Sequence, residues 1–172
     1  MRTSQLIAQI QDVFKDVPRA DTSLFQYVLT DQKGISGSIT DKEWNEAGVS
    51  RTDNTWTDIQ NDQIEDCDCQ LAHMTPKDFT YYLPAYMCYS LSSIETKNLS
   101  QDILGSTLHS LYPSKKDTSL YNYSLNQLSF LNITQQNIII DFLEFVSVNA
   151  NEFDQPYARK SLERYWYARK SN

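Results

Sequence analysis

The most informative segment of this chain is TPKDFTYYLPAYMCYSL, residues 75–91. It opens with the signals of a helix start, because Thr75 is a good N-cap residue and Pro76 fits the first helical position. An acidic residue follows in the first turn, where it suits the helix dipole. The aromatic run predicts a helix, which Pro84 is expected to kink or split near Tyr82, because proline removes a backbone hydrogen bond and clashes with the preceding turn.

Both faces of this predicted helix are suited to burial. Tyr82, Tyr86 and Tyr89 are spaced i, i+4 and i+7 and share one face. The second face is more apolar and carries Phe79, Leu83, Met87 and Leu91. One interpretation is a central core helix that the other helices wrap around. The other is that the break at Pro84 opens a cleft for a ligand or a partner peptide. Such a cleft would be lined by Tyr81, Tyr82 and Tyr86, with Trp44 and Trp56 as its walls.

Helical signals recur along the rest of the chain. Apolar periodicity, caps and stops predict further helices at 6–14, 24–29, 40–48, 100–111, 124–131, 134–146 and 154–170. The segment 24–29 also fits a strand, and 50–70 is expected to be irregular, with a helical turn or two. The clearest stripe is that of 134–146, where Thr134 is the expected cap. We therefore predict an all-α protein, one compact domain spanning 1–172, with six to eight helices around the proline-interrupted aromatic helix.

Length and charge restrict the classes of function. The chain has 172 residues, a formal net charge of −7 and a pI of about 4.7. An acidic chain is a poor match for nucleic acid, which binds basic surfaces, or for an anionic membrane. It is compatible with a basic protein partner, or the charge serves solubility alone. The oligomeric state is left open by the sequence.

Several observations favour the cytoplasm. The N-terminal segment is amphipathic, unlike the continuous apolar core of a secretion signal, and no stretch has the length of a membrane span. The three cysteines suit a reducing compartment, since three cannot all pair within one chain.

The segment LAHMTPKDFTYYLPAY, residues 71–86, carries a resemblance. Together with Trp56 upstream and the ending LERYW at 162–166, it is similar to the signature T-P-x-x-F-x-Y-Y-L-P-A-Y of an uncharacterised bacterial family. The resemblance covers roughly 40–168, and the chain departs from the family pattern in 60–70. It implies a helical bacterial protein and no activity.

Cys67, Cys69 and His73 bring three potential metal ligands together within seven residues. Zinc sites use four tetrahedral ligands, usually with wider spacing between the cysteines. The alternative interpretation is two partly buried thiols in a variable loop. No cofactor is predicted.

The segment 41–68 is strongly acidic, with nine acidic residues and two basic ones. If its second half is helical, Asp58, Asp62, Glu65 and Asp66 share a face. Clustered carboxylates can bind a hard cation or do acid–base work. The other interpretations are a solvated surface, a face for a basic partner, and a contact with the basic last helix of the same chain.

The sequence leaves two functions open. The first is a non-enzymatic, acidic interaction protein, comparable in size and charge with bacterial immunity proteins that neutralise basic enzymes. The second is a small ligand-binding protein or hydrolase-type enzyme that uses a tyrosine-lined cleft, with His73 as a base beside Tyr81 or Tyr82 and carboxylates nearby. His73 also fits a structural role. The chain contains none of the common nucleophile, phosphate-loop or metalloprotease motifs.

Overall fold

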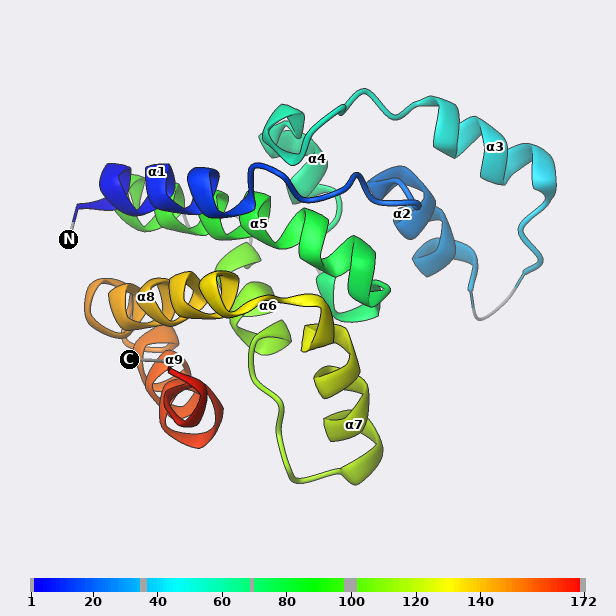
Figure 1. Cartoon of the computed structure of the whole chain (residues 1–172). Helices are drawn as coiled ribbons and strands as arrows, with labels where there is room; N and C mark the ends of the chain where they lie inside the picture. Colours follow the sequence, from blue (N-terminus) through cyan, green and yellow to red (C-terminus); the bar gives the residue numbers. More distant parts are fainter. Residues whose placement is uncertain (1, 35–36, 69, 98–101, 171–172) are drawn as a thin grey trace.

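The aromatic segment folds as the central helix of an all-helical protein. The computed structural model describes residues 2–34, 37–68, 70–97 and 102–170. In it, α5 (Pro76–Thr96) packs against α1, α6 and several shorter elements (Figure 1). Thirteen of its 21 residues are buried, which is the burial expected of a core helix.

Of the two effects expected at Pro84, a kink or a split, the split is wrong. Helix α5 continues through Pro84 as one element and ends where Lys97 adopts a left-handed conformation, with φ of 55°. A proline inside a helix costs about 3 kcal/mol. The helix tolerates this cost because side chains on both faces of the helix, before and after the proline, are buried, and their burial stabilises the helix. Its start is as predicted, since the Thr75 side chain accepts a hydrogen bond from the Asp78 N–H, at 3.3 Å.

The described residues contain nine α-helices and no strand, which confirms the all-α prediction and slightly exceeds the six to eight helices expected. Besides α5 they are α1 (Thr3–Phe14), α2 (Leu24–Lys33), α3 (Asp41–Val49), α4 (Asn61–Glu65), α6 (Ile103–Ser110), α7 (Thr118–Gln127), α8 (Ile133–Asn149) and α9 (Asp154–Ser161). Short 3₁₀ or π turns connect them: η1 (Trp56–Asp58), η2 (Gln70–His73), η3 (Leu128–Phe130), η4 (Leu162–Trp166) and η5 (Tyr167–Arg169).

Caps explain where several boundaries differ from the prediction. Helix α7 begins six residues earlier than expected, because the Asp117 side chain accepts from the Leu120 N–H at 2.9 Å. Helix α8 is capped by Asn132 rather than Thr134, and its Gln135 completes a capping box. Ser23 caps α2, which resolves the choice between helix and strand for 24–29 in favour of helix.

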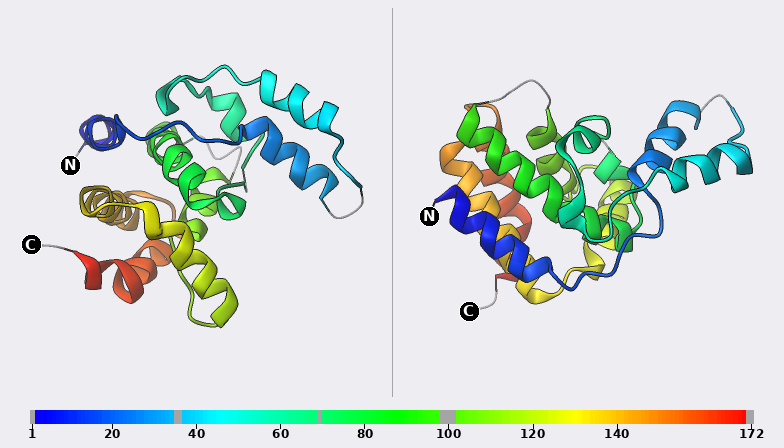
Figure 2. Two further views of the ribbon diagram at one scale, coloured as in Figure 1. Left: turned by 45° about the vertical axis from the view of Figure 1, so that its right-hand side comes forward. Right: turned by 90° about the horizontal axis from the view of Figure 1, so that it is seen from above.

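One apolar cluster contains the buried hydrophobic side chains of the described segments, apart from Tyr112. Its main layers are α5 with α1, then α8 and α6, and finally α9, which packs on α8 (Figures 1 and 2). The predicted stripe of α8 is confirmed, since the five residues that form it are buried: Ile138, Ile139, Phe142, Leu143 and Val146. Within the described ranges, no helix has both the length and the apolar character needed to cross a bilayer.

Helices α2 and α3 leave this body as an arm. In two views the pair projects to one side, with α3 packed along α2 and away from the central layers (Figures 1 and 2). Helix α3 contributes no buried residue at all. Within the arm, α2 is therefore anchored in the body by buried residues and α3 is not.

Candidate functional site

The tyrosines of α5 are core residues. Tyr81, Tyr82 and Tyr86 are 0% exposed. Each hydroxyl donates a hydrogen bond inside the protein, from Tyr82 to the Thr22 carbonyl at 2.9 Å and from Tyr86 to the Cys67 carbonyl at 2.7 Å. The open tyrosine-lined cleft expected from the sequence is thus absent from this helix, and of the two interpretations the core helix is correct.

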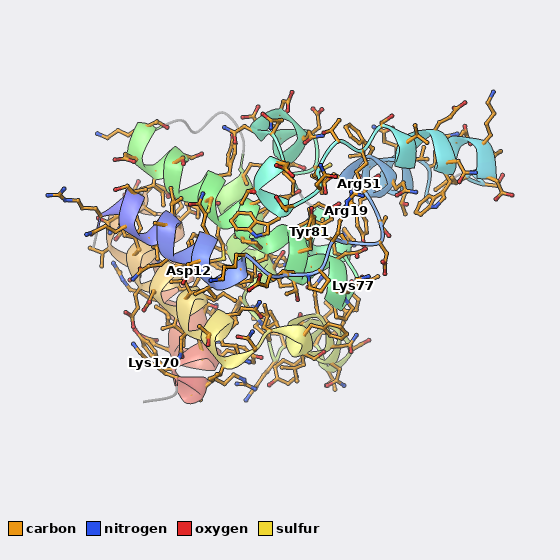
Figure 3. The ribbon with its side chains drawn as sticks, turned by 45° about the horizontal axis from the view of Figure 1, so that its top comes forward. Asp12, Arg19, Arg51, Lys77, Tyr81 and Lys170 are labelled. Carbon is orange, nitrogen blue, oxygen red and sulfur yellow. The ribbon has the colours of Figure 1, made fainter. Side chains whose placement is uncertain are left out.

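Tyr81 donates to a buried ion pair. Its hydroxyl lies 2.6 Å from Asp53, whose carboxylate is also held by Arg51 at 2.7 Å and is 3.7 Å from Arg19 (Figure 3). Burial alone would raise the pKa of Asp53, but the hydrogen bonds from Arg51 and Tyr81 and the positive charge of Arg51 outweigh it and lower that pKa. Arg51 also donates to the Ala20 carbonyl at 2.6 Å, so the pair fastens the 18–23 linker to α5.

A second buried carboxylate, Asp78, reinforces the same linker. It accepts from the backbone N–H groups of Asp21 and Thr22, at 2.8 and 3.3 Å, and from the Tyr27 hydroxyl at 2.8 Å. The neighbouring Trp56 is 4% exposed and donates to the Phe14 carbonyl at 2.9 Å. Trp56 is therefore not a cleft wall, and these groups hold the fold together rather than face a ligand.

The predicted carboxylate face is surface structure with local bonds. Asp58 accepts from the N–H groups of Asn54 and Thr55, at 2.9 and 2.7 Å, and these bonds lower its pKa. Asp62 accepts from the N–H of Gln63 at 2.8 Å, and Glu65 accepts from the Tyr89 hydroxyl. Among the described residues, no three histidine, cysteine or carboxylate side chains are placed to hold a metal ion.

Two of the three candidate metal ligands, Cys67 and His73, lie in different environments. Cys67 is buried, with its Sγ 3.5 Å from the Leu24 carbonyl, whereas His73 is exposed at the end of η2. Cys69 lies outside the described residues.

The α2–α3 arm is held by polar contacts. Ser23 donates to the Ala47 carbonyl at 3.3 Å and Gln26 to the Trp44 carbonyl at 3.1 Å. Lys33 pairs with Glu43, and that hydrogen bond, with those from Thr40, lowers the pKa of Glu43 to about 2. Trp44 remains 37% exposed, so it stands on the arm and does not wall a cleft with Trp56.

The acidic segment and the basic C-terminal end lie on different sides of the molecule. The acidic elements α3 and α4 lie at the top of Figure 1, whereas the basic end of the chain, α9 to η5, lies at the bottom. Lys170 at that end pairs with Glu144 of α8, at 2.9 Å, far from Arg51 in Figure 3. The described elements of the acidic segment pack on α2 and α5 rather than on the last helix, which disfavours the interpretation of a contact between the two.

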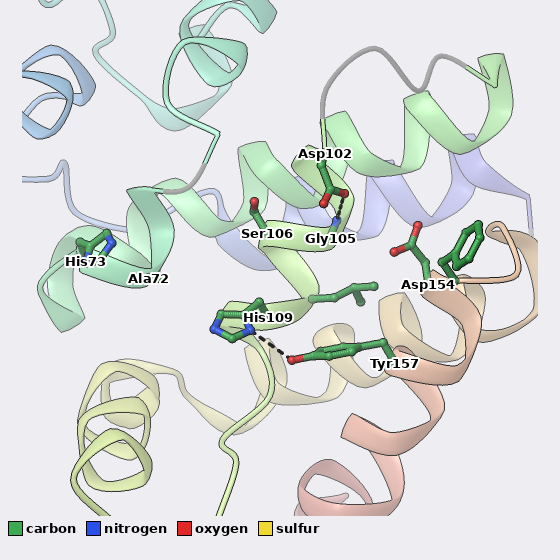
Figure 4. Close-up of a pocket in the computed structure, with 10 residues that line it drawn as sticks. Ala72, His73, Asp102, Gly105, Ser106, His109, Asp154 and Tyr157 are labelled. Carbon is green, nitrogen blue, oxygen red and sulfur yellow. Dashed lines mark hydrogen bonds between the residues drawn. The ribbon is translucent and has the colours of Figure 1, made fainter. Parts of the chain in front are cut away.

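Both histidines of the chain line one groove, which the sequence did not predict. His73 from η2 and His109 from α6 line two adjoining depressions, of about 550 and 610 Å³. His109 Nδ1 lies 3.1 Å from the Tyr157 hydroxyl of α9 (Figure 4). The two histidines are 36 positions apart, and no local sequence signal links them.

Comparison with known proteins gives a family without an activity. The model of a family of unknown function (DUF6714) matches residues 2–170, which include the core helix, the arm and the groove. No curated protein and no solved structure matches the sequence. The match confirms the resemblance to an uncharacterised family. The chain thus belongs to the family of unknown function DUF6714.

Proposed function

We propose that this chain is a non-enzymatic interaction protein whose α2–α3 arm binds a basic protein. The observation that carries the proposal is α3 itself, a nine-residue helix without a buried residue. Isolated helices shorter than ~12–15 residues are marginal in water, and most helical stability in proteins comes from packing an apolar face. A partner that covers α3 would supply the packing that the chain itself does not.

The chemistry of the arm suits a basic partner. Asp41 and Glu46 are exposed on α3, and Asp58, Asp62 and Asp66 are exposed further along the same acidic segment. This segment carries as much net negative charge as the entire chain. Complementary charge raises association rates and excludes wrong partners, while exposed aromatic residues anchor interfaces. Trp44, on the same helix, is the natural anchor.

The structure does not favour the competing function in the form expected from the sequence. A hydrolase-type enzyme was expected to use Tyr81, Tyr82 and Tyr86 in a cleft, and these side chains are enclosed by the core. The proposal implies a particular kind of partner. It would be a basic enzyme in the bacterial cytoplasm, which this chain neutralises as immunity proteins neutralise their targets.

The test is site-specific crosslinking in the native cell. A photoreactive amino acid replaces Trp44 in one strain and Val148 in another. Val148 is 71% exposed on α8, outside the arm. We expect one basic protein to be captured from position 44 and not from position 148. The purified pair should then bind in a manner that weakens with salt, and about tenfold more weakly after Trp44→Ala.

Two outcomes would contradict the proposal. One is the capture of the same proteins from both positions. The other is a purified complex whose affinity is unchanged by Trp44→Ala and by the double variant Asp41→Asn, Glu46→Gln.

A further inference from the structure

The groove between η2, α6, α7 and α9 is a second candidate site, independent of the arm. Its two halves share the walls formed by Ala72, His73 and His109. One half reaches α9 and the other reaches α7. Concave sites that combine apolar walls with a few convergent polar groups are the usual form of small-molecule sites.

Polar groups in the α9 half have unused bonding capacity. Asp102 accepts through Oδ1 from the Gly105 N–H at 3.0 Å, and Asp154 accepts through Oδ2 from the Asn151 side chain at 2.6 Å. Asp102 is exposed and Asp154 is partly buried, and the second oxygen of each carboxylate makes no hydrogen bond to another described residue. Figure 4 shows Asp102 and Asp154 across this half from each other, with Ser106 near Asp102 and with His109 further along the recess, next to Tyr157.

The two carboxylates are close enough to influence each other. Burial raises the pKa of Asp154, and the negative charge of Asp102 raises it further. Among the described residues that line this half there is no lysine or arginine to balance the two charges. The half is therefore a negatively charged recess without an internal cation.

Aromatic rings complete the recess. Phe153 is 80% exposed at its rim, next to Asp154, and Tyr157 forms part of its wall. An exposed phenylalanine beside a carboxylate pair offers a ring face over which a cation held by the carboxylates can lie. The other half contains Lys116, which makes it less suited to a cation.

We propose that the α9 half of this groove binds a small organic cation, a molecule with a primary ammonium or guanidinium group. The cationic group sits between Asp102 and Asp154 and against the ring of Phe153. The remainder of the molecule extends past His109 toward the α7 half.

The test is an NMR titration with putrescine at constant ionic strength. The matched control ligand is 1,4-butanediol, which has the same carbon chain and no charge. Putrescine should shift the amide signals of 103–109 and 154–157, and butanediol should not. Asp154→Asn should weaken putrescine binding about tenfold, because it removes one of the two charges and leaves the shape.

A second carboxylate provides the control variant. Asp141 is also half-buried with a raised pKa, caused by burial and by Glu144, but it lines a separate depression between α1 and α8. Asp141→Asn should leave binding unchanged. Phe153→Ala, at a position too exposed to affect folding, should weaken it severalfold. Equal shifts with putrescine and butanediol, no shifts with either, or equal affinities for wild type and Asp154→Asn would each overturn the proposal.

Discussion

Helices α5 and α3 show how differently one chain can use similar residues. Helix α5 buries thirteen of its 21 residues, whereas α3 buries none of its nine. Each has a tryptophan in or near it: Trp56, beside α5, is 4% exposed, and Trp44, on α3, is 37% exposed. Aromatic content alone therefore does not distinguish core from binding surface. The difference lies in what holds each helix, apolar burial for α5 and hydrogen bonds for α3.

Polar groups follow the same division. Around α5 two carboxylates, Asp53 and Asp78, are buried and hydrogen-bonded, as in the contact of Asp53 with Arg51 and Tyr81. On α3 the pair of Lys42 and Glu46 is exposed, at 3.8 Å. A buried pair is costly to break because one charge is left without its partner, while an exposed pair contributes little. The first kind of group fixes the fold and the second is free to meet another molecule.

The largest expected effect comes from the buried tryptophan. Trp56→Ala should lower the free energy of unfolding by about 3–5 kcal/mol, because it leaves a cavity and removes the hydrogen bond to the Phe14 carbonyl. Urea unfolding followed by circular dichroism measures this change. Trp44→Ala is the matched control and should cost less than about 1 kcal/mol. Similar losses for the two variants would contradict the assignment of Trp44 to a surface.

The buried ion pair should give the next largest effect. Asp53→Asn should lower the free energy of unfolding by about 3 kcal/mol, since the Arg51 guanidinium stays buried without a counter-charge. Glu46→Gln, which removes the exposed pair with Lys42, should change it by less than about 0.5 kcal/mol. If the two variants lose equal stability in urea, the distinction between core and arm pairs fails.

Acid should reduce the difference between wild type and Asp53→Asn. Because the pKa of Asp53 is lowered in the folded protein, its ionised form stabilises the fold above the unfolded value of about 3.9. This contribution is lost as the pH falls through the lower, folded pKa. Urea unfolding from about pH 7 to about pH 2.5 should therefore show a constant difference above about pH 4 and a shrinking one below. A difference that stays constant down to the lowest pH would contradict the lowered pKa.

Local signals explain which features the sequence predicted correctly. The cap at Thr75 and the stripe of α8 depend on neighbours within a turn or two, so spacing alone reveals them. The same local logic failed at Pro84, because the packing of the whole helix outweighs the cost of one proline. It also missed the cap at Asp117, which lies in a segment rich in lysine and serine that looked like a loop.

The site residues were harder to predict because tertiary contacts decide their roles. Tyr81 meets Asp53 across 28 positions, and nothing in either segment indicates the pairing. His73 and His109 share a groove only because η2 packs on α6. The sequence does not give the exposure of each side chain. That exposure is what separates the buried tyrosines from Trp44 and from the residues at the rim of the groove.

The smallest effect concerns the arm alone and tests whether it opens independently of the core. The Thr40 side chain caps α3 by accepting from the Glu43 N–H, at 3.3 Å. Thr40→Ala should remove about 1 kcal/mol from the local stability of α3 and speed amide exchange there about fivefold. The amides of α5 should exchange at unchanged rates, because they open only with global unfolding, and the urea midpoint should not move. Helix α3 contributes no apolar burial to the body, so its opening exposes no core side chain. If exchange in α3 and α5 accelerated together, the two helices would belong to one cooperative unit, and a partner would meet an arm as rigid as the core.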